Sequence, residues 1–166
     1  MSLKSSPYII CRMLESDVKS VKKLEMKCGL SPWSLEDYKR EVLRNDSYSI
    51  VAKNPFEELK GFAISRWSLN GFENGDISKG KFAEIYNICV GESDRRQGIG
   101  RNLIVSMTGE FKERGISEVW LDVRKSNRLA IKFYEKQGFV KTYTRKNFYS
   151  KPVEDAVGMK LILSEK

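Results

Sequence analysis

A strongly β-type run leads directly into a glycine- and arginine-rich loop and then into an amphipathic helix. The run is FAEIYNICV (82–90), and the loop ends in RRQGIG (95–100). Residues 98–115 follow with an apolar stripe at helical spacing, formed by Leu103, Ile104, Met107 and Phe111. Together with a further β-type run at 117–124, this order is typical of a right-handed crossover in an α/β sheet. No other segment constrains the fold as strongly.

The loop in front of that helix has the composition of an anion site. The first turn of a helix carries unbonded N–H groups and the positive end of the helix dipole. Gly98 and Gly100 let a ligand approach this backbone without a Cβ atom in the way. Positive charge comes from Arg95, Arg96 and Arg101. By itself the motif also describes a surface turn, so its interpretation depends on the rest of the chain.

The remaining segments predict further strands and helices around this unit. β-type composition is found at 8–14, 47–53, 59–69, 139–146 and 156–163, and helical spacing at 15–28, 34–45 and 127–138. Glycine and polar residues fill 70–81, where we expect a long loop. The order predicts one α/β domain (8–166) with a mixed, mostly antiparallel sheet of about six to seven strands and helices on both faces. Residues 1–7 are expected to be disordered or left from cloning.

Composition narrows the class of protein. With 40% hydrophobic and 31% charged residues, the chain of 166 residues is typical of a single globular domain. It contains no apolar run of membrane-spanning length and no signal-peptide pattern, so we expect no membrane partner. The net charge of +8 fits an anionic partner such as a nucleotide cofactor, and it fits plain solubility equally well. Because the basic residues are spread along the chain, we expect no direct binding of nucleic acid.

The cysteine and histidine counts argue against several kinds of site and of catalytic mechanism. Cys11, Cys28 and Cys89 are odd in number, far apart and without a CxxC pair. We therefore expect neither a disulfide framework nor a zinc site, and a reducing cytoplasm as the compartment. The absence of histidine excludes Ser-His and Cys-His triads. Any proton transfer must use a carboxylate, a tyrosine, a cysteine, a lysine or water.

Asp122 interrupts the otherwise apolar run VWLDV (119–123). A carboxylate in such a strand is costly unless it is paired or useful. Burial raises the pKa of a carboxyl group, and a carboxylate with a raised pKa is a competent general base. The alternative is a structural ion pair with Arg124 or with a nearby lysine.

The motif RRQGIG has the form R/Q-x-x-G-x-G/A, and with its surroundings the sequence resembles the GNAT superfamily of acetyl-CoA-dependent N-acetyltransferases. Two further segments, WLDVRKSNRLAIKFYEKQGFVKTYTRKNFY downstream and LEMKCGLSPWS upstream, resemble the RimI-type branch, the ribosomal-protein-alanine N-acetyltransferases. The resemblance runs from about Tyr8 to Leu163. It implies a GNAT fold, with a splay between the fourth and fifth strands, acetyl-CoA as cosubstrate and no metal.

The resemblance also implies where acetyl-CoA binds. The pantetheine arm would bond to the backbone of Ile88, Cys89 and Val90, with the N–H of Val90 as oxyanion donor. Asn127 would contact the cofactor further along, and the pyrophosphate would be held by Arg96, Gln97, Gly98, Ile99, Gly100 and Arg101. An ordinary buried strand at 88–90 is compatible with this role, because the contacts come from the backbone.

For catalysis the resemblance implies a base and an acid. The RimI-type branch has a glutamate at the position of Asp122, which takes a proton from the substrate amine. The aspartate of this chain is one methylene shorter, which favours a bridging water. Tyr134 follows twelve residues later, at the spacing of the family's general acid, and would protonate the thiolate of departing CoA. A core tyrosine beside Phe133 is the alternative, and Glu84 could supply a second carboxylate.

On the acceptor side, Glu25 and Trp33 match the segment that lines the peptide groove in this family, with helix surface and core as alternatives. Tyr149, in a hairpin expected at 144–152, would contact the acceptor peptide. The sequence therefore predicts an N-acetyltransferase that modifies a protein N-terminal α-amine, by preference a ribosomal-protein alanine, and that acts as a monomer or weak dimer. The alternatives are a GNAT enzyme for a small-molecule amine and a non-catalytic acetyl-CoA-binding module.

Overall fold

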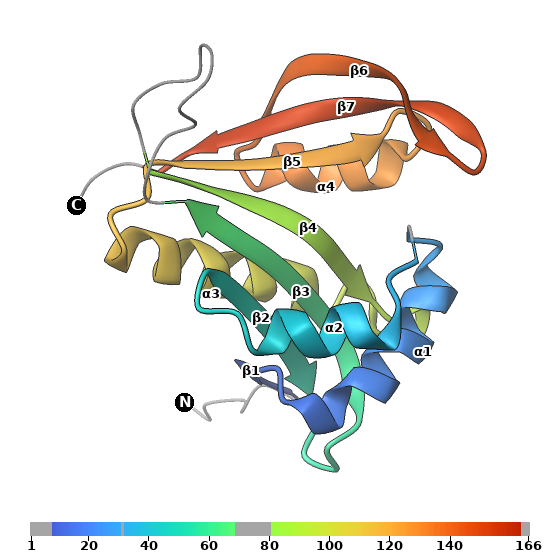
Figure 1. The fold of residues 1–166 in the computed structure, drawn as a ribbon, viewed down its shortest axis with the longest axis vertical. Helices are drawn as coiled ribbons and strands as arrows, with labels where there is room; N and C mark the ends of the chain where they lie inside the picture. The colour runs from blue at the N-terminus through green and yellow to red at the C-terminus, as the bar shows by residue number, and fades with distance from the viewer. Residues whose placement is uncertain (1–7, 31, 69–80, 164–166) are drawn as a thin grey trace. The chain divides into compact units, whose positions relative to one another are not determined.

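The computed structural model describes residues 8–30, 32–68 and 81–163 (Figure 1). Our expectations for residues 1–7 and for the loop at 70–80 lie outside this part of the chain. Seven strands in the described part form one sheet, in the order β1-β2-β3-β4-β5-β7-β6. The predicted mixed α/β sheet is therefore confirmed. Within the same residues, no helix has the length and the apolar character needed to cross a membrane.

The elements follow the order that the sequence predicts. The strands are β1 (Ile9–Arg12), β2 (Ser47–Lys53), β3 (Leu59–Ser68), β4 (Phe82–Val90), β5 (Glu118–Arg124), β6 (Val140–Ser150) and β7 (Val153–Ile162). The helices are α1 (Val18–Cys28), α2 (Leu35–Val42), α3 (Ile99–Glu113) and α4 (Arg128–Lys136), with short 3-10 turns η1 (Glu15–Asp17) and η2 (Glu92–Asp94). β6 and β7 together form a longer hairpin than the one expected.

β4 and β5 run parallel, but their ladder is short. It joins Phe82–Ile85 to Glu118–Leu121 and ends there. On its other side β5 is paired along its whole length, because Glu118–Arg124 lie antiparallel to Ala156–Ile162 of β7. The predicted splay between the fourth and fifth strands would begin at Ile85 and Leu121, where the first of these ladders ends.

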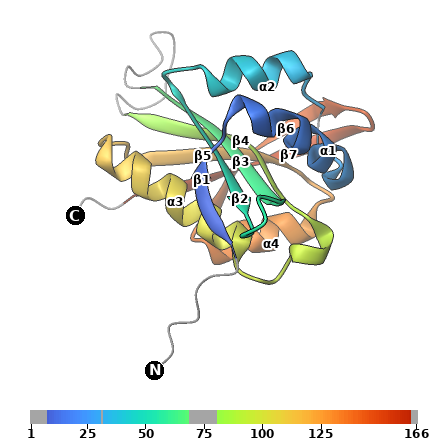
Figure 2. The ribbon, with the colours of Figure 1, turned by 90° about the horizontal axis from the view of Figure 1, so that it is seen from below.

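The chain forms two compact units. The first unit comprises Met1–Ser65 and Asn87–Met107, and the second unit comprises Arg66–Tyr86 and Thr108–Lys166. β3, β4 and α3 each continue from one unit into the other. In the first unit, α1 and α2 cover one side of β1–β3 and the start of α3 lies on the other side (Figure 2).

Apolar side chains from α1, α2 and β3 build the core of the first unit. Val21 of α1, Tyr38 of α2 and Phe62 of β3 are fully buried and belong to one cluster. The rings of Tyr38 and Phe62 meet edge to face, with 6.1 Å between their centroids. α2 begins where the sequence predicts, because Ser34 caps it and the Asp37 carboxylate bonds back to the Ser34 amide.

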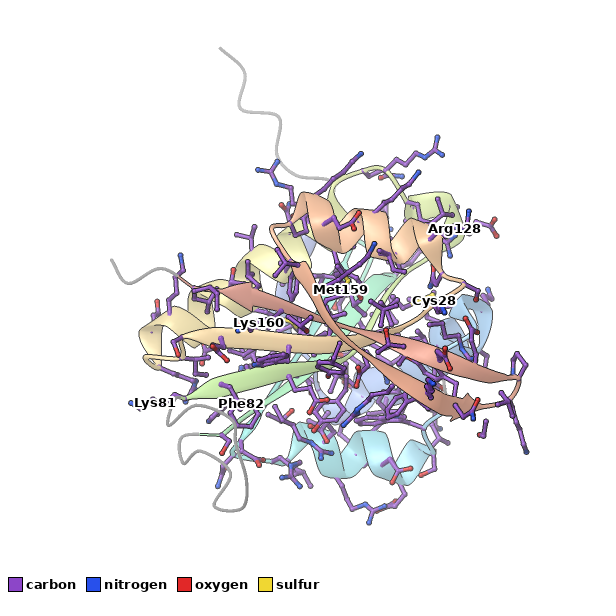
Figure 3. All side chains as sticks on the ribbon, turned by 90° about the horizontal axis from the view of Figure 1, so that it is seen from above. Cys28, Lys81, Phe82, Arg128, Met159 and Lys160 are labelled. Atoms are coloured by element: carbon purple, nitrogen blue, oxygen red, sulfur yellow. A yellow bond between two sulfur atoms is a disulfide. The ribbon has the colours of Figure 1, made fainter. Side chains whose placement is uncertain are left out.

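Cys28 (Figure 3) and Cys89 form a disulfide in the first unit, which corrects our expectation that the chain has no disulfide framework. Cys28 is the last residue of α1, and the packing of this helix brings its Cα atom to 6.2 Å from the Cα atom of Cys89 on β4. The pairing depends on tertiary structure, since 61 residues separate the two cysteines and no motif marks them. Cys11 is free, which explains the odd count.

Reduction of this disulfide should destabilise the protein. Opening a cross-link across 61 residues returns freedom to the unfolded chain, an effect of about 2–4 kcal/mol on the free energy of unfolding. Urea denaturation with and without a reductant measures it. Cys28→Ser should give the same loss without reductant, and Cys11→Ser is the matched control that should leave the midpoint nearly unchanged. Equal midpoints for the wild type and Cys28→Ser under oxidising conditions would contradict the prediction.

Candidate active site

The loop before α3 has the backbone geometry of an anion site. Arg96 and Gly98 both adopt left-handed conformations, with φ of 63° and 83°, so the chain turns sharply as it enters α3. A non-glycine residue in this region is strained, and such strain clusters at binding sites. The side chains of Arg96, Gln97 and Arg101 are exposed, whereas Ile99 is only 2% exposed. Ile99 can therefore offer a ligand its backbone but not its side chain.

The end of β4 lies next to this loop within the first unit. The Arg95 guanidinium donates to the Val90 carbonyl at 3.3 Å. A Cβ atom added to Gly61 of β3 would lie 3.1 Å from the Ile99 side chain, 3.4 Å from the Val90 side chain and 2.9 Å from the Cys89 carbonyl oxygen. The glycine is thus required by close packing. The structure brings the predicted pantetheine strand and the predicted pyrophosphate loop together.

Glu25 and Trp33 also lie together, but the Glu25 carboxylate is only 1% exposed. Its Oε1 atom accepts hydrogen bonds from the Trp33 amide and from the Tyr38 hydroxyl, both at 2.8 Å, and the Lys22 ammonium donates to Oε2. Burial, followed by the bond to Glu25, raises the pKa of Tyr38 well above its usual range. Glu25 therefore anchors the segment between α1 and α2, and Trp33 is the half-buried member of the pair.

Asp122 lies in the second unit and is paired with Arg145 of β6. Its side chain is 9% exposed, and Arg145 Nη1 donates to Oδ2 at 2.8 Å. Oδ1 is buried and has no hydrogen-bond partner among the described residues. The structural ion pair that was the alternative for Asp122 is therefore present, but its partner is Arg145. Arg124, the partner expected from the sequence, bonds to Glu154 at 3.2 Å instead. The Tyr149 hydroxyl donates to the Asp122 carbonyl at 3.3 Å, so these two predicted residues meet.

Glu84 of β4 shares a face of the sheet with Asp122. It stands opposite Trp120 in the β4–β5 ladder, and Asp122 is two residues beyond Trp120, on the same side of β5. Burial raises the pKa of the Glu84 carboxyl group, and the charge of Asp122 raises it further. A hydrogen bond with Tyr86 and the charge of Arg145 act in the opposite direction.

Aromatic rings lie on the same face of the sheet as the two carboxylates. The ring of Tyr143 stacks on Trp120, with 6.1 Å between centroids, and lies across Gly158 of β7. A Cβ atom at Gly158 would be 2.2 Å from that ring, so only glycine leaves room for it. Burial, followed by the charge of Asp122, raises the pKa of both Tyr143 and Tyr149 to about 12. Both hydroxyl groups are therefore protonated at neutral pH.

Tyr134 of α4 is almost fully buried, and its ring meets Phe133 and Phe139 at 5.3 and 5.6 Å between centroids. Burial, followed by the charge of Tyr149, raises the pKa of Tyr134 above its usual range. The hydroxyl group is protonated, as a general acid requires, but the raised pKa makes it a weaker acid than an exposed tyrosine. The core and the catalytic interpretations of Tyr134 are thus compatible.

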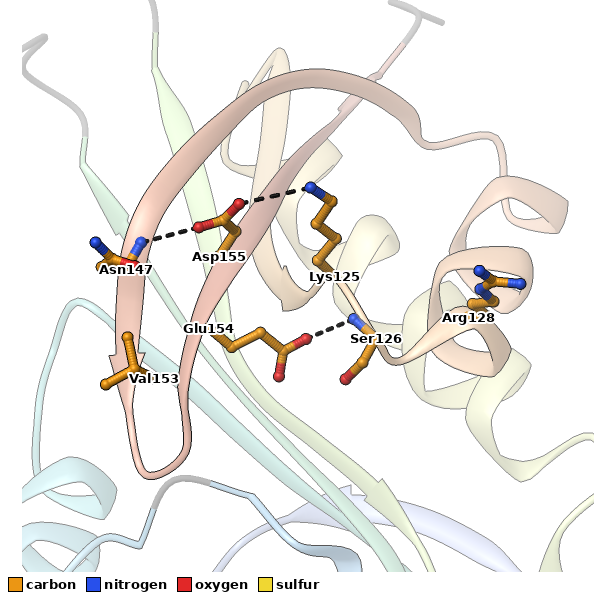
Figure 4. Close-up of a pocket in the computed structure, with 7 residues that line it drawn as sticks. All are labelled: Lys125, Ser126, Arg128, Asn147, Val153, Glu154 and Asp155. Carbon is orange, nitrogen blue, oxygen red and sulfur yellow. Dashed lines mark hydrogen bonds and ion pairs between the residues drawn. The ribbon is translucent and has the colours of Figure 1, made fainter.

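Asn127 caps α4, with its Oδ1 atom accepting from the Ala130 amide at 3.1 Å. A polar pocket opens around the start of this helix, between the β5–α4 connection and the β6–β7 hairpin (Figure 4). Asp155 bonds to the Lys125 ammonium at 3.6 Å and to the Asn147 amide at 3.0 Å. The pocket is lined by Lys125, Ser126, Arg128, Asn147, Val153, Glu154 and Asp155. These bonds fasten the hairpin to the start of α4.

Sequence reasoning did not single out Arg145, Tyr143 or Asn87. The register of β6 against β7 shifts between Lys141 and Tyr143 and again between Arg145 and Tyr149, so simple alternation does not give the direction of their side chains. Asn87 of β4 is 6% exposed, and its amide nitrogen is buried without a partner among the described residues. A polar residue at an inward position of a β-type run was its only signal.

A comparison with known proteins identifies the family to which the chain belongs. The model of the Acetyltransferase (GNAT) family matches residues 18–139. The chain therefore belongs to the GNAT family of acetyltransferases, which confirms the predicted fold and enzyme class. Among the described residues, no group of histidine, cysteine and carboxylate side chains could hold a metal ion.

Individual relatives and solved structures are similar to the chain over most of its length. The [ribosomal protein bS18]-alanine N-acetyltransferase of Haemophilus ducreyi is 30% identical over 156 residues, which cover 91% of this chain and 97% of the relative. The enzyme of the same name from Escherichia coli K12 is 29% identical over 151 residues, covering 90% and 93%. The crystal structure of the E. coli ribosomal-protein-S18-alanine N-acetyltransferase has a TM-score of 0.80 and 27% identity, over 96% of each chain. Arabidopsis thaliana NAA60 in complex with acetyl-CoA shares the fold, with a TM-score of 0.83 and 19% identity over 94% and 98%.

Glu25→Gln should destabilise the first unit. An amide cannot replace a carboxylate that accepts three hydrogen bonds, so we expect a loss of about 1–3 kcal/mol in the free energy of unfolding. Urea denaturation measures it. The control is Glu36→Gln on the exposed surface of α2, which should change stability by less than about 0.5 kcal/mol. If both variants lost the same amount, the anchoring role of Glu25 would be wrong.

Proposed function

We propose that this chain transfers the acetyl group of acetyl-CoA to the α-amine of a protein N-terminus, and that the acceptor is the N-terminal alanine of a small-subunit ribosomal protein. The observation that carries the proposal is the similarity to [ribosomal protein bS18]-alanine N-acetyltransferases over 91% of this chain. This similarity extends beyond residues 18–139, which the family model matches. It therefore reaches outside the part that defines the family as a whole.

The first unit would bind the cofactor. Arg96 and Arg101 would face the pyrophosphate charge, and N–H donors at the start of α3 would come from the backbone of Gln97, Gly98, Ile99 and Gly100. The backbone of Ile88, Cys89 and Val90 would pair with the pantetheine arm. In the second unit, Asn127 would reach the cofactor through its side-chain nitrogen, since its oxygen caps α4.

The chemistry would follow from alignment and proton transfer. Alignment of the amine with the thioester supplies most of the rate, and the N–H of Val90 would stabilise the oxyanion. Asp122 would act through Oδ1, the oxygen that Arg145 leaves unoccupied, on the amine or on a bridging water. Tyr134 would donate its proton to the departing sulfur. On the acceptor side, Trp33 with the Glu25 anchor and Tyr149 would contact the peptide.

We place this activity in the cytoplasm, where ribosomal proteins are made, with the chain acting as a monomer or weak dimer. The Cys28–Cys89 disulfide is unusual for that compartment. Cytosolic disulfides are found as redox-sensing pairs and in hyperthermophiles, so the disulfide is compatible with a cytoplasmic enzyme.

A peptide screen tests the acceptor. An alanine-initiated peptide from the N-terminus of the organism's own S18 protein should release CoA with a kcat/KM at least about tenfold above that of polyamines, amino sugars or free amino acids. Its N-terminally acetylated form is the control and should not react. A preference for a small amine would replace the proposed acceptor, while CoA binding without any turnover would point to a binding module.

Tyr134→Phe tests the acid. Loss of the hydroxyl group should lower kcat by about ten- to a thousandfold, because nothing then protonates the thiolate, while the affinity for acetyl-CoA stays nearly intact. Steady-state kinetics and calorimetric titration with acetyl-CoA measure the two quantities. An unchanged kcat would remove Tyr134 from the mechanism.

A further inference from the structure

The loop before α3 is fastened at both of its ends. Where the loop leaves β4, the Gly91 amide donates to the Lys60 carbonyl at 2.9 Å, and the Lys60 ammonium lies 3.8 Å from the Asp94 carboxylate. Where the chain enters α3, the Asn102 side-chain amide donates to the Tyr8 hydroxyl at 2.7 Å. This second bond joins residues that are 94 positions apart, so the pattern of the sequence does not predict it.

Tyr8 also approaches the left-handed turn at the end of this loop. A Cβ atom added to Gly98 would lie 3.7 Å from the Tyr8 hydroxyl oxygen, which is ordinary van der Waals contact. Tyr8 is only 6% exposed, so packing restricts its ring. The next residue, Ile9, is paired with Lys53 in the ladder between β1 and β2. The hydroxyl group is therefore held by its own strand and gives the turn a firm support.

Asn102 connects this support to the first turn of α3. Its backbone amide donates to the Gly98 carbonyl at 2.9 Å, while its side chain reaches Tyr8. Tyr8, Gly98 and Asn102 thus form a closed set of contacts at the point where the helix begins. The loop requires such a support, because Arg96 has a positive φ, and a strained residue keeps its conformation only when its surroundings hold it.

We propose that Tyr8, with Asn102 as its partner, is a positioning residue for acetyl-CoA that holds the loop before α3 in the conformation that receives the pyrophosphate. The family resemblance assigns neither residue to the cofactor. The inference rests on the proposed placement of acetyl-CoA and deepens it. Tyr8 acts through the loop and not through contact with the cofactor, because a loop that is already ordered loses less conformational freedom when the ligand binds.

The size of the effect follows from the fraction of molecules whose loop is ready to bind. The apparent dissociation constant equals the intrinsic one divided by that fraction. Loss of one neutral hydrogen bond changes such an equilibrium by about two- to tenfold. Once acetyl-CoA is bound, the loop is ordered in every variant, so kcat should stay the same.

Calorimetric titration with CoA and steady-state kinetics test the proposal together. Tyr8→Phe should raise the dissociation constant of CoA by about two- to tenfold and leave kcat unchanged. Asn102→Ala should have the same effect. The double variant should bind CoA no more weakly than the weaker single variant, because both substitutions remove the same bond.

A matched control is found one turn further along α3. The hydroxyl groups of Tyr48 on β2 and Ser106 on α3 lie 3.3 Å apart, so a second tyrosine bonds to the same helix away from the loop. Tyr48→Phe makes the same chemical change and should leave the dissociation constant of CoA unchanged. Thermal melting without ligand shows whether each variant is folded.

A truncated cosubstrate locates the effect at the pyrophosphate. S-acetylpantetheine has the thioester and the pantetheine arm but no pyrophosphate. With this compound, kcat/KM should be equal in the wild type and in Tyr8→Phe. An equal loss with acetyl-CoA and with S-acetylpantetheine would show general damage to the site and would overturn the proposal.

The titrations decide the matter even without turnover. The proposal is overturned if Tyr8→Phe binds CoA as tightly as the wild type, if Tyr48→Phe weakens binding by the same factor, or if the losses of the two single variants multiply in the double variant. If the wild type binds CoA but acetylates no protein N-terminus, the acceptor assignment fails while the titrations still test Tyr8. A wild type that does not bind CoA would overturn both.

Discussion

The short ladder between β4 and β5 is the constraint on which the proposed site depends. β5 is paired along its whole length to β7, but to β4 over four residue pairs only. Backbone groups released by the shortened ladder need other partners, and an extended ligand can satisfy them. At the end of this ladder, Glu84 and Asp122 project from the same face of the sheet. In a complete ladder, backbone groups that the proposed function assigns to the cofactor would already be paired.

Much of the fold could be predicted from the sequence, because local signals and long-range packing agree in this chain. The capping box of Ser34 and Asp37 starts α2 as expected, and Gly29 ends α1 with a positive φ of 65°. Asp122 could be singled out because a carboxylate in an apolar strand requires a reason. What could not be predicted was its partner. Arg145 reaches Asp122 from a strand with two register shifts, and an irregular strand has no period from which a direction follows.

Glu25 shows how a resemblance and a structure give different kinds of information. The resemblance places this residue in the acceptor segment with Trp33, and the structure brings the two residues together. Burial and three hydrogen bonds then decide what the side chain does there, which is to hold the Trp33 amide and the Tyr38 hydroxyl. The disulfide between Cys28 and Cys89 illustrates the same limit. Neither cysteine carries a local signal, and only the docking of α1 against β4 pairs them.

Gly158 has no side chain, yet it decides what its neighbours can be. The space that a Cβ atom would occupy is filled by the ring of Tyr143, which covers the Asp122 side of the sheet. The residues at the two positions therefore constrain each other. A relative with a larger residue at 158 must have lost or moved the aromatic ring at 143, and the reverse exchange would open a hole beside the carboxylates. If Asp122 serves the acceptor as proposed, space for a bulkier acceptor should be made at Tyr143, with the glycine left in place.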